Sequence, residues 1–249
     1  MWFNNIFTIL NSVTKALTNR SLNKFSQLAN TWGRSSNLKV NGLRLAIRLV
    51  NVIFLSVASL PAHAAKPVIL VYGDSLSAAY GIAQEQGWVS LLQQRLDKNK
   101  LNFTVINASI SGETTSGGLS RIDGALKEHQ PKIILIELGA NDGLRGLPIA
   151  EMRKNLNAMI AISKKYKAKV ILIGMRIPPN YGLKYTGDFK SSYELLAKQY
   201  KLAFVPFLLD GVAGSRELNQ EDGIHPIAKA EPIVLNNVWR VLEVIIKLR

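Results

Sequence analysis

The sequence between residues 65 and 249 alternates short apolar runs with helical patterns. The apolar runs read as strands, and they cover residues 68–72, 103–106, 132–138, 169–173 and 203–205. Continuous runs of this kind are typical of strands that are buried on both faces. Apolar residues at helical spacing predict helices over residues 88–96, 152–166, 189–200 and 227–248. The alternation predicts an α/β fold in which helices cover both faces of a parallel sheet.

Residues 1–64 carry much of the positive charge. The 249-residue chain has a net charge of +14, and this segment holds seven basic and no acidic residues, so half of the net charge lies here. Basic residues precede a mostly apolar run over 49–60, which is followed by the small-residue stretch PAHA at 61–64. This order is typical of a secretory signal peptide. We expect cleavage after Ala64 and a periplasmic or secreted protein of a Gram-negative bacterium.

The leader leaves two alternatives open. A retained membrane anchor is one, although the apolar run contains Asn51 and falls short of the roughly 20 apolar residues of a span. Residues 1–36 precede the expected signal and are interpreted as an over-long gene model with the true start near Val40, or else as a transit-like peptide. The expected organisation is a leader over 1–64 and one domain over 65–249.

Composition excludes several kinds of site. A hydrophobic fraction of 47% with 19% charged residues excludes a disordered chain. The absence of cysteine excludes a disulfide scaffold, a Cys-ligated zinc site and a thiol nucleophile, and three histidines leave little room for a histidine-rich site, so we expect no metal. The basic cluster at Lys164, Lys165, Lys167 and Lys169 has no interleaved aromatic residues. We therefore expect a solvated helix end and no nucleic-acid partner.

Polar residues gather after the predicted strands, where open α/β sheets bind their ligands. Ser75 follows the first strand closely, and Asp222 lies three residues before His225 in a late loop. A serine nucleophile needs a base and a carboxylate that orients the base. His63 leaves with the leader and His129 lies in a polar helix end, so His225 is the expected base. The three residues predict a Ser-His-Asp triad.

The same strand ends offer donors for an oxyanion. Gly112 has no side chain, so its N–H group could approach a bound oxyanion closely, and Asn141 offers a side-chain amide. Together with the N–H group of Ser75 they would form a three-donor oxyanion hole.

Four ordered sequence blocks carry a family resemblance. They are GDSLS at 73–77, Gly112, GAND at 139–142 and DGIH at 222–225. These blocks resemble those of the SGNH (GDSL) hydrolases, and nearby stretches resemble the bacterial thioesterase and lysophospholipase type within that family. The resemblance implies a flavodoxin-like, three-layer α/β/α fold with a five-stranded parallel sheet. It also implies a cofactor-free enzyme that uses the triad and oxyanion hole named above.

The expected substrates are acyl esters and thioesters, as for an acyl-CoA thioesterase, lysophospholipase or arylesterase. A carbohydrate acetyl-esterase is the first alternative, and a non-catalytic lipid-binding protein is the second. Five apolar loop residues are candidates to line an acyl crevice or, equally, to pack beneath the loops: Ile110, Leu144, Leu147, Ile177 and Tyr181. We also expect a monomer and weak contact with phospholipid surfaces.

The residue at 77 departs from the Gly-x-Ser-x-Gly elbow of α/β-hydrolases, because it is Ser77. We interpret this as a looser turn that opens a short helix and leaves the site more open. A bulkier leucine at this position would then narrow the range of substrates.

Overall fold

The computed structural model describes residues 66–247, which contain a five-stranded sheet. The expected leader and its cleavage site lie outside the described residues. The strands are β1 (Val68–Gly73), β2 (Thr104–Asn107), β3 (Ile133–Glu137), β4 (Lys169–Ile173) and β5 (Ala203–Val205). Every neighbouring pair is parallel, and the order is β2-β1-β3-β4-β5. This order is flavodoxin-like and confirms the fold class expected from the sequence.

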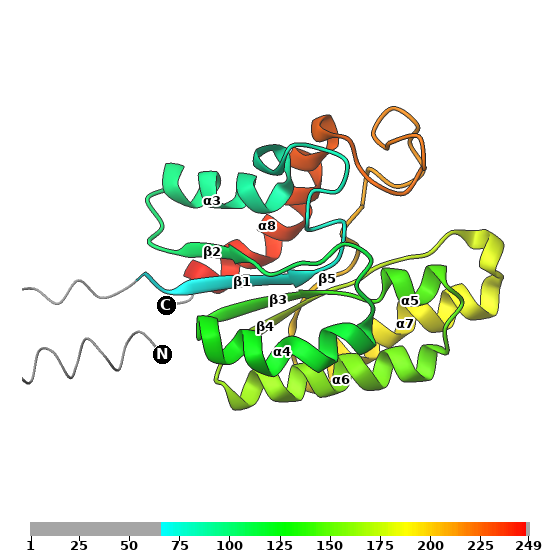
Figure 1. The fold of residues 1–249 in the computed structure, drawn as a ribbon, viewed down its shortest axis with the longest axis horizontal. Helices are drawn as coiled ribbons and strands as arrows, with labels where there is room; N and C mark the ends of the chain where they lie inside the picture. Colours follow the sequence, from blue (N-terminus) through cyan, green and yellow to red (C-terminus); the bar gives the residue numbers. More distant parts are fainter. Residues whose placement is uncertain (1–65, 248–249) are drawn as a thin grey trace, which may run out of the picture. The chain divides into compact units, whose positions relative to one another are not determined.

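Helices cover both faces of the sheet (Figure 1). The α-helices are α3 (Trp88–Lys98), α4 (Thr115–His129), α5 (Ala140–Leu144), α6 (Ile149–Lys165), α7 (Leu183–Tyr200) and α8 (Glu231–Lys247). Short 3₁₀ turns are η1 (Gln84–Gln86), η2 (Pro179–Tyr181) and η3 (Ala228–Ala230). Helices α3 and α8 pack on one face, and α4, α6 and α7 pack on the other (Figure 1). Within residues 66–247, no helix has both the length and the apolar character that a membrane span requires.

The strands differ in burial according to their place in the sheet. Central strands β1, β3 and β4 are buried almost throughout, as continuous apolar runs predict. Strands β2 and β5 are only partly buried, contrary to expectation. Each is an edge strand with one neighbour, so one flank of its backbone and side chains stays open to solvent.

Helix α4 was not expected from apolar spacing, which indicated only a polar helix end near His129. The helix contains three glycines, each of which lowers intrinsic helix propensity by about 1 kcal/mol relative to alanine. Tertiary contacts stabilise it instead, since Ile122 and Leu126 lie one turn apart and are fully buried. The side chain of Thr114 caps its first turn by accepting a hydrogen bond from the Gly117 N–H group at 3.3 Å.

Gly118 allows α4 to approach its neighbours closely. A Cβ atom at this position would lie 2.5 Å from the Cδ1 atom of Leu138, just beyond β3, and 3.4 Å from the sulfur of Met159 on α6. Gly124, two turns further along α4, is exposed and would place its Cβ in open space. The two glycines therefore differ only in what surrounds them.

Alanine substitution at these glycines should change stability in opposite directions. Gly118→Ala should lower the free energy of unfolding by about 1–2 kcal/mol, because overpacking outweighs the gain in helix propensity. Gly124→Ala should raise it by up to about 1 kcal/mol. Denaturant unfolding of the two variants checks this, and equal effects at both positions would contradict the packing argument.

Candidate active site

The strand order gathers the candidate residues at one edge of the sheet. Strand β1 lies between β2 and β3, so the segments that follow all three strands meet at their carboxyl ends. Ser75 lies two residues beyond β1, Gly112 lies in the loop after β2, and Asn141 lies in α5 after β3. His225 comes from the long segment between β5 and η3.

Ser75, His225 and Asp222 form a continuous chain of hydrogen bonds. The Nε2 atom of His225 lies 2.8 Å from the Oγ atom of Ser75, and its Nδ1 atom lies 2.6 Å from Oδ2 of Asp222. The side chain of His225 is 17% exposed, so it is largely shielded from solvent. The ring of Tyr80 packs against the imidazole with 4.5 Å between centroids. The geometry brings together the three residues that the sequence selected.

Asp222 is held in its ionised form. Partial burial alone would raise its pKa, but hydrogen bonds from the side chain and backbone of His225 and from the backbone of Ile224 lower the pKa to about 2. The two backbone N–H groups reach Oδ1 at 3.0 and 2.9 Å, which leaves Oδ2 for the imidazole. A carboxylate fixed in this way accepts the Nδ1 proton of His225 and so sets the tautomer of the imidazole.

The three residues that are expected to supply oxyanion donors line one cavity; they are Ser75, Gly112 and Asn141. Among residues 66–247, the backbone N–H groups of Ser75 and Gly112 have no hydrogen-bond acceptor. The side-chain amide of Asn141 differs, because its Nδ2 atom donates to Oδ2 of Asp74 at 3.1 Å and to the carbonyl of Glu113 at 3.0 Å. The two backbone N–H groups are therefore free to bind an oxyanion, whereas the Asn141 amide is already hydrogen-bonded to neighbouring acceptors.

Asp74 is a buried carboxyl group directly before Ser75. Its Oδ1 atom accepts from the Leu76 N–H group at 3.0 Å, while Oδ2 accepts from Asn141. Burial raises its pKa from 3.8 to about 6, against the opposing effects of the Leu76 hydrogen bond and of His225. Asp74 thereby links the turn that carries the serine to the amide after β3.

Glu137 is a second buried carboxyl group beneath that turn. Its Oε2 atom accepts from Oγ of Ser77 at 2.8 Å and from the Asp74 N–H group at 3.3 Å. Within the described residues its Oε1 atom has no hydrogen-bond partner. Burial, and secondly the charge of Asp74, raise the pKa of Glu137 well above 4.5, which favours the neutral acid. A Cβ atom on Gly73 would lie 2.5 Å from Oε2, so the strand end has room only for glycine.

These contacts change the interpretation of Ser77. The residue is 2% exposed, and its hydroxyl group contacts Glu137 rather than the cavity. The segment around Ser75 has turn hydrogen bonds, from Ala78 N to Asp74 O and from Tyr80 N to Ser75 O, but no regular helix. A leucine at 77 would displace Glu137 rather than narrow the range of substrates.

The site opens into a cavity of about 280 Å³. Besides the catalytic candidates, its lining includes Leu76, Tyr80, Ser111, Ala140, Leu144 and Ile224. Of the five candidate acyl-binding residues, Leu144 is the one that lines this cavity. Ile110 and Leu147 are 50% and 39% exposed.

The other two candidate acyl-binding residues, Ile177 and Tyr181, are not among the residues that line the cavity. Ile177 is buried, and a Cβ atom on Gly143 would lie 2.7 Å from its Cγ2 atom. Tyr181 donates a hydrogen bond to the carbonyl of Leu144 at 2.7 Å, and it lines a separate open depression with Tyr185. Both residues therefore lie next to the start of the segment over 143–148.

Sequence reasoning missed the residues that surround the reactive groups. Tyr80 and Ile224 line the cavity although both are substantially exposed. Their only sequence signal was position, since Ile224 lies within the DGIH block and Tyr80 lies three residues after the GDSLS block. Glu137 had a clearer signal, since it is an acidic residue inside a predicted buried strand. Such a residue is either paired or functional.

A parallel α/β sheet with a serine, an imidazole and a carboxylate in hydrogen-bond order at its carboxyl edge is an arrangement typical of serine hydrolases. Residues 71–231 match the GDSL-like lipase/acylhydrolase family. The chain belongs to this family, and it is a hydrolase that acts on ester bonds.

Individual relatives support the assignment. The chain is 47% identical over 189 residues to "Esterase TesA" of Pseudomonas aeruginosa, covering 76% of this chain and 94% of the relative. It is 38% identical over 180 residues to "Thioesterase 1/protease 1/lysophospholipase L1" of Escherichia coli, covering 72% of this chain and 85% of the relative. The crystal structure of TesA superposes with a TM-score of 0.69 at 48% identity, covering 71% of this chain and 98% of the other.

Replacing the buried acid by its neutral amide should alter the pH dependence of stability. Because the pKa of Glu137 is higher in the folded than in the unfolded chain, the native protein loses stability as pH rises from about 4.5 toward the folded pKa. Glu137→Gln does not titrate, so its stability relative to the parent should increase over that range. Urea unfolding between pH 4 and pH 8 checks this.

The matched control is Glu194→Gln, at a solvent-exposed ion pair on α7. Its stability relative to the parent should stay nearly constant with pH. If the stability of Glu137→Gln relative to the parent is equally independent of pH, the pKa of Glu137 is not raised in the folded protein.

Proposed function

We propose that this chain is a serine esterase that hydrolyses acyl esters and thioesters through Ser75, His225 and Asp222. The single observation that carries the proposal is the hydrogen-bond chain from Oγ of Ser75 through the imidazole to Oδ2 of Asp222. Its serine end faces a cavity, and two unpaired backbone N–H groups lie on the same wall. This is the arrangement that acyl transfer requires.

The first half of the reaction forms an acyl-enzyme. Nε2 of His225 takes the proton of Ser75 as Oγ bonds to the carbonyl carbon, and the carbonyl electron pair moves to the oxygen. The N–H groups of Ser75 and Gly112 stabilise that oxyanion. When the tetrahedral intermediate collapses, the alcohol or thiol leaves and receives the proton from His225.

The second half releases the acid. His225 deprotonates a water molecule that attacks the acyl carbon, and collapse of the new intermediate returns the proton to Oγ of Ser75. The carboxylate of Asp222 stabilises the imidazolium in both halves, and its pKa of about 2 keeps it ionised at neutral pH.

Asn141 is the proposed third donor to the oxyanion. In the free enzyme its Nδ2 atom already donates to Asp74 and to the Glu113 carbonyl. One of these hydrogen bonds must be shared or exchanged when negative charge develops in the cavity. An oxyanion is a stronger acceptor than the neutral carbonyl of Glu113, because charge-assisted hydrogen bonds exceed neutral ones in strength.

Apolar residues around the opening support an acyl substrate. Leu144 lines the cavity, and Tyr80 and Ile224 border it with large exposed surfaces. A cavity of about 280 Å³ encloses the carbons next to the carbonyl, and a longer chain would continue over exposed Ile110 or Leu147. The same exposed apolar rim would favour weak contact with a phospholipid surface. The relatives named as an esterase and as a thioesterase and lysophospholipase support this substrate class.

We also propose that residues 1–64 direct export, because a basic segment, an apolar run and PAHA occur in signal-peptide order. Expression of the full chain in a Gram-negative host should give a periplasmic protein whose first residue is Ala65. Amino-terminal sequencing of the periplasmic fraction checks this. A mature chain that retains residues 49–60 and stays with the membrane would support the anchor instead.

Activity on acyl substrates of graded length tests the proposed function. We expect kcat/KM for aryl esters and acyl-CoA thioesters to rise from two carbons to longer chains, because more apolar surface is buried at the opening. Ser75→Ala should lower kcat by roughly 10⁴-fold or more. Steady-state kinetics of the purified protein checks both.

The matched control is Ser191→Ala on α7, whose hydroxyl bonds only to a backbone carbonyl one turn earlier. It should retain full activity. Activity that persists in Ser75→Ala would refute the proposed mechanism, and Ser75-dependent activity confined to acetyl esters would move the substrate to acetylated compounds.

A further inference from the structure

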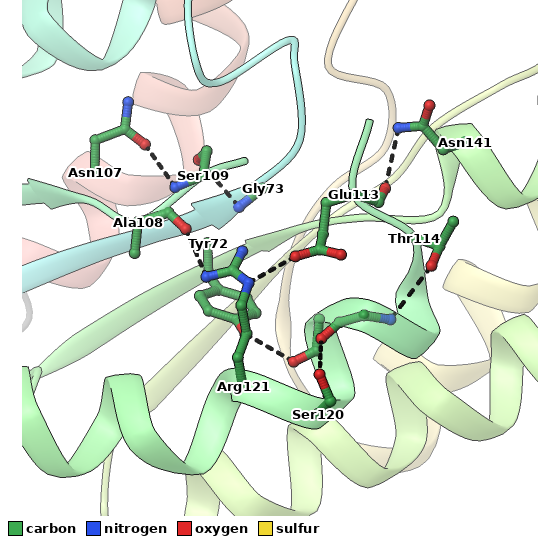
Figure 2. Close-up of polar contacts among 12 residues, drawn as sticks. Tyr72, Gly73, Asn107, Ala108, Ser109, Glu113, Thr114, Ser120, Arg121 and Asn141 are labelled. Carbon is green, nitrogen blue, oxygen red and sulfur yellow. Dashed lines mark hydrogen bonds and ion pairs between the residues drawn. The ribbon is translucent and has the colours of Figure 1, made fainter. Parts of the chain in front are cut away.

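The loop that carries Gly112 is tied at both ends to one arginine. Arg121, in the second turn of α4, donates from Nη1 to the carbonyl of Ala108 at 2.8 Å. Its Nε atom donates to Oε2 of Glu113 at 2.6 Å (Figure 2). Ala108 and Glu113 flank the loop, so a single guanidinium sets the separation of its two ends.

The guanidinium itself is held by an aromatic ring. Its Cζ atom lies 4.1 Å from the ring centroid of Tyr72, a fully buried residue of β1. The hydroxyl group of Tyr72 donates to the carbonyl of Gly118 at 2.7 Å, which ties the ring back to α4. The side chains of Arg121 and Glu113 are 25% and 12% exposed, so this ion pair is shielded from most solvent.

Glu113 connects this arginine to the two oxyanion donors that lie outside the serine turn. Its backbone N–H group donates to the carbonyl of Ile110 at 3.1 Å, closing a tight turn in which Gly112 has a φ of +77°. Its carbonyl oxygen accepts from Nδ2 of Asn141 at 3.0 Å (Figure 2). Displacing Glu113 would therefore move the Gly112 N–H group and release the Asn141 amide together.

We propose that Arg121 and Glu113 are positioning residues that set the Gly112 and Asn141 donors for the oxyanion. The inference rests on the proposed function and adds two residues to it. Neither residue lines the cavity, so they act through the donors rather than on the substrate. Arginine suits this task because its planar group serves a carboxylate and a carbonyl from different nitrogens while one face rests on a ring. A lysine, as a single ammonium group, cannot reproduce that geometry.

Two substitutions test the proposal without removing the backbone contacts. Arg121→Lys keeps the charge, and Glu113→Gln keeps the length of the side chain and its carbonyl to Asn141. Each should lower kcat by about 10- to 100-fold, less than the complete loss of one oxyanion donor, with KM changed less than about twofold. The double variant should lose no more than the worse single variant, because both break the same linkage.

The affinity for an inhibitor that forms a tetrahedral adduct is a second measurement, and it would not change if the two residues had a purely structural role. An alkyl boronic acid bonds to Oγ of Ser75 and places an oxygen where the oxyanion forms, so its affinity should fall by the same factor as kcat/KM. Affinity for the corresponding alkyl alcohol, which lacks the tetrahedral centre, should stay unchanged. Inhibition constants for both compounds, measured with the full set of variants, check this.

The matched control is Arg95→Lys on α3, where another guanidinium rests over an aromatic ring, that of Trp239 at 5.4 Å. It should lower Tm without changing kcat or boronate affinity. The proposal is overturned if Arg121→Lys lowers Tm like the control and leaves kcat and boronate affinity intact. It is also overturned if KM alone changes, since that indicates direct substrate contact.

Ser75→Ala separates this inference from the function on which it rests. If Ser75→Ala remains active, both the proposed serine mechanism and the inference that rests on it are wrong. If Ser75→Ala is inactive while Arg121→Lys and Glu113→Gln behave like the parent, only the positioning role fails.

Discussion

The position of β1 between β2 and β3 is the constraint on which the site depends. Because all five strands are parallel, the segments that leave β1, β2 and β3 start at the same edge of the sheet. One segment carries Ser75, the next carries Gly112, and the third carries Asn141. The proposed nucleophile and the proposed oxyanion donors thus come from three separate segments at the carboxyl edge of one sheet, which is the general site of ligand binding in open α/β sheets.

Rigidity at this edge comes from polar groups that the apolar core surrounds. Asp74 accepts hydrogen bonds from the turn after β1 and from Asn141. Glu137 accepts a hydrogen bond from the Ser77 hydroxyl group. Burying two carboxyl groups costs stability, as their raised pKa values record. These hydrogen bonds orient the turn and the Asn141 amide, because hydrogen bonds are directional and apolar contacts are not. Arg121 and Glu113 extend the same kind of constraint to the loop before α4.

Sequence patterns predicted most of the sheet and several helices because long, periodic apolar segments dominate them. Strands β4 and β5 have the predicted bounds, β1 extends one residue further, and β2 and β3 differ from their predicted bounds by one residue at each end. Helix α4 was not predicted because its three glycines lower helix propensity and it has few apolar residues at helical spacing besides the buried Ile122 and Leu126. Arg121 lies on that helix, so its role could not be inferred from the motifs. The leader over 1–64 stays a prediction from sequence order alone.

The sequence by itself determined which chemical groups are available. Four short blocks specify a serine, a late histidine with an aspartate three residues before it, a glycine and an asparagine, and local turn geometry pairs Asp222 with His225. Tertiary structure alone decided that His225 meets Ser75 across 150 residues, and that Glu137 lies under the serine turn. It also decided which apolar loop residues face the cavity. Contacts between distant segments depend on how helices and strands pack, and that packing is absent from any local pattern of residues.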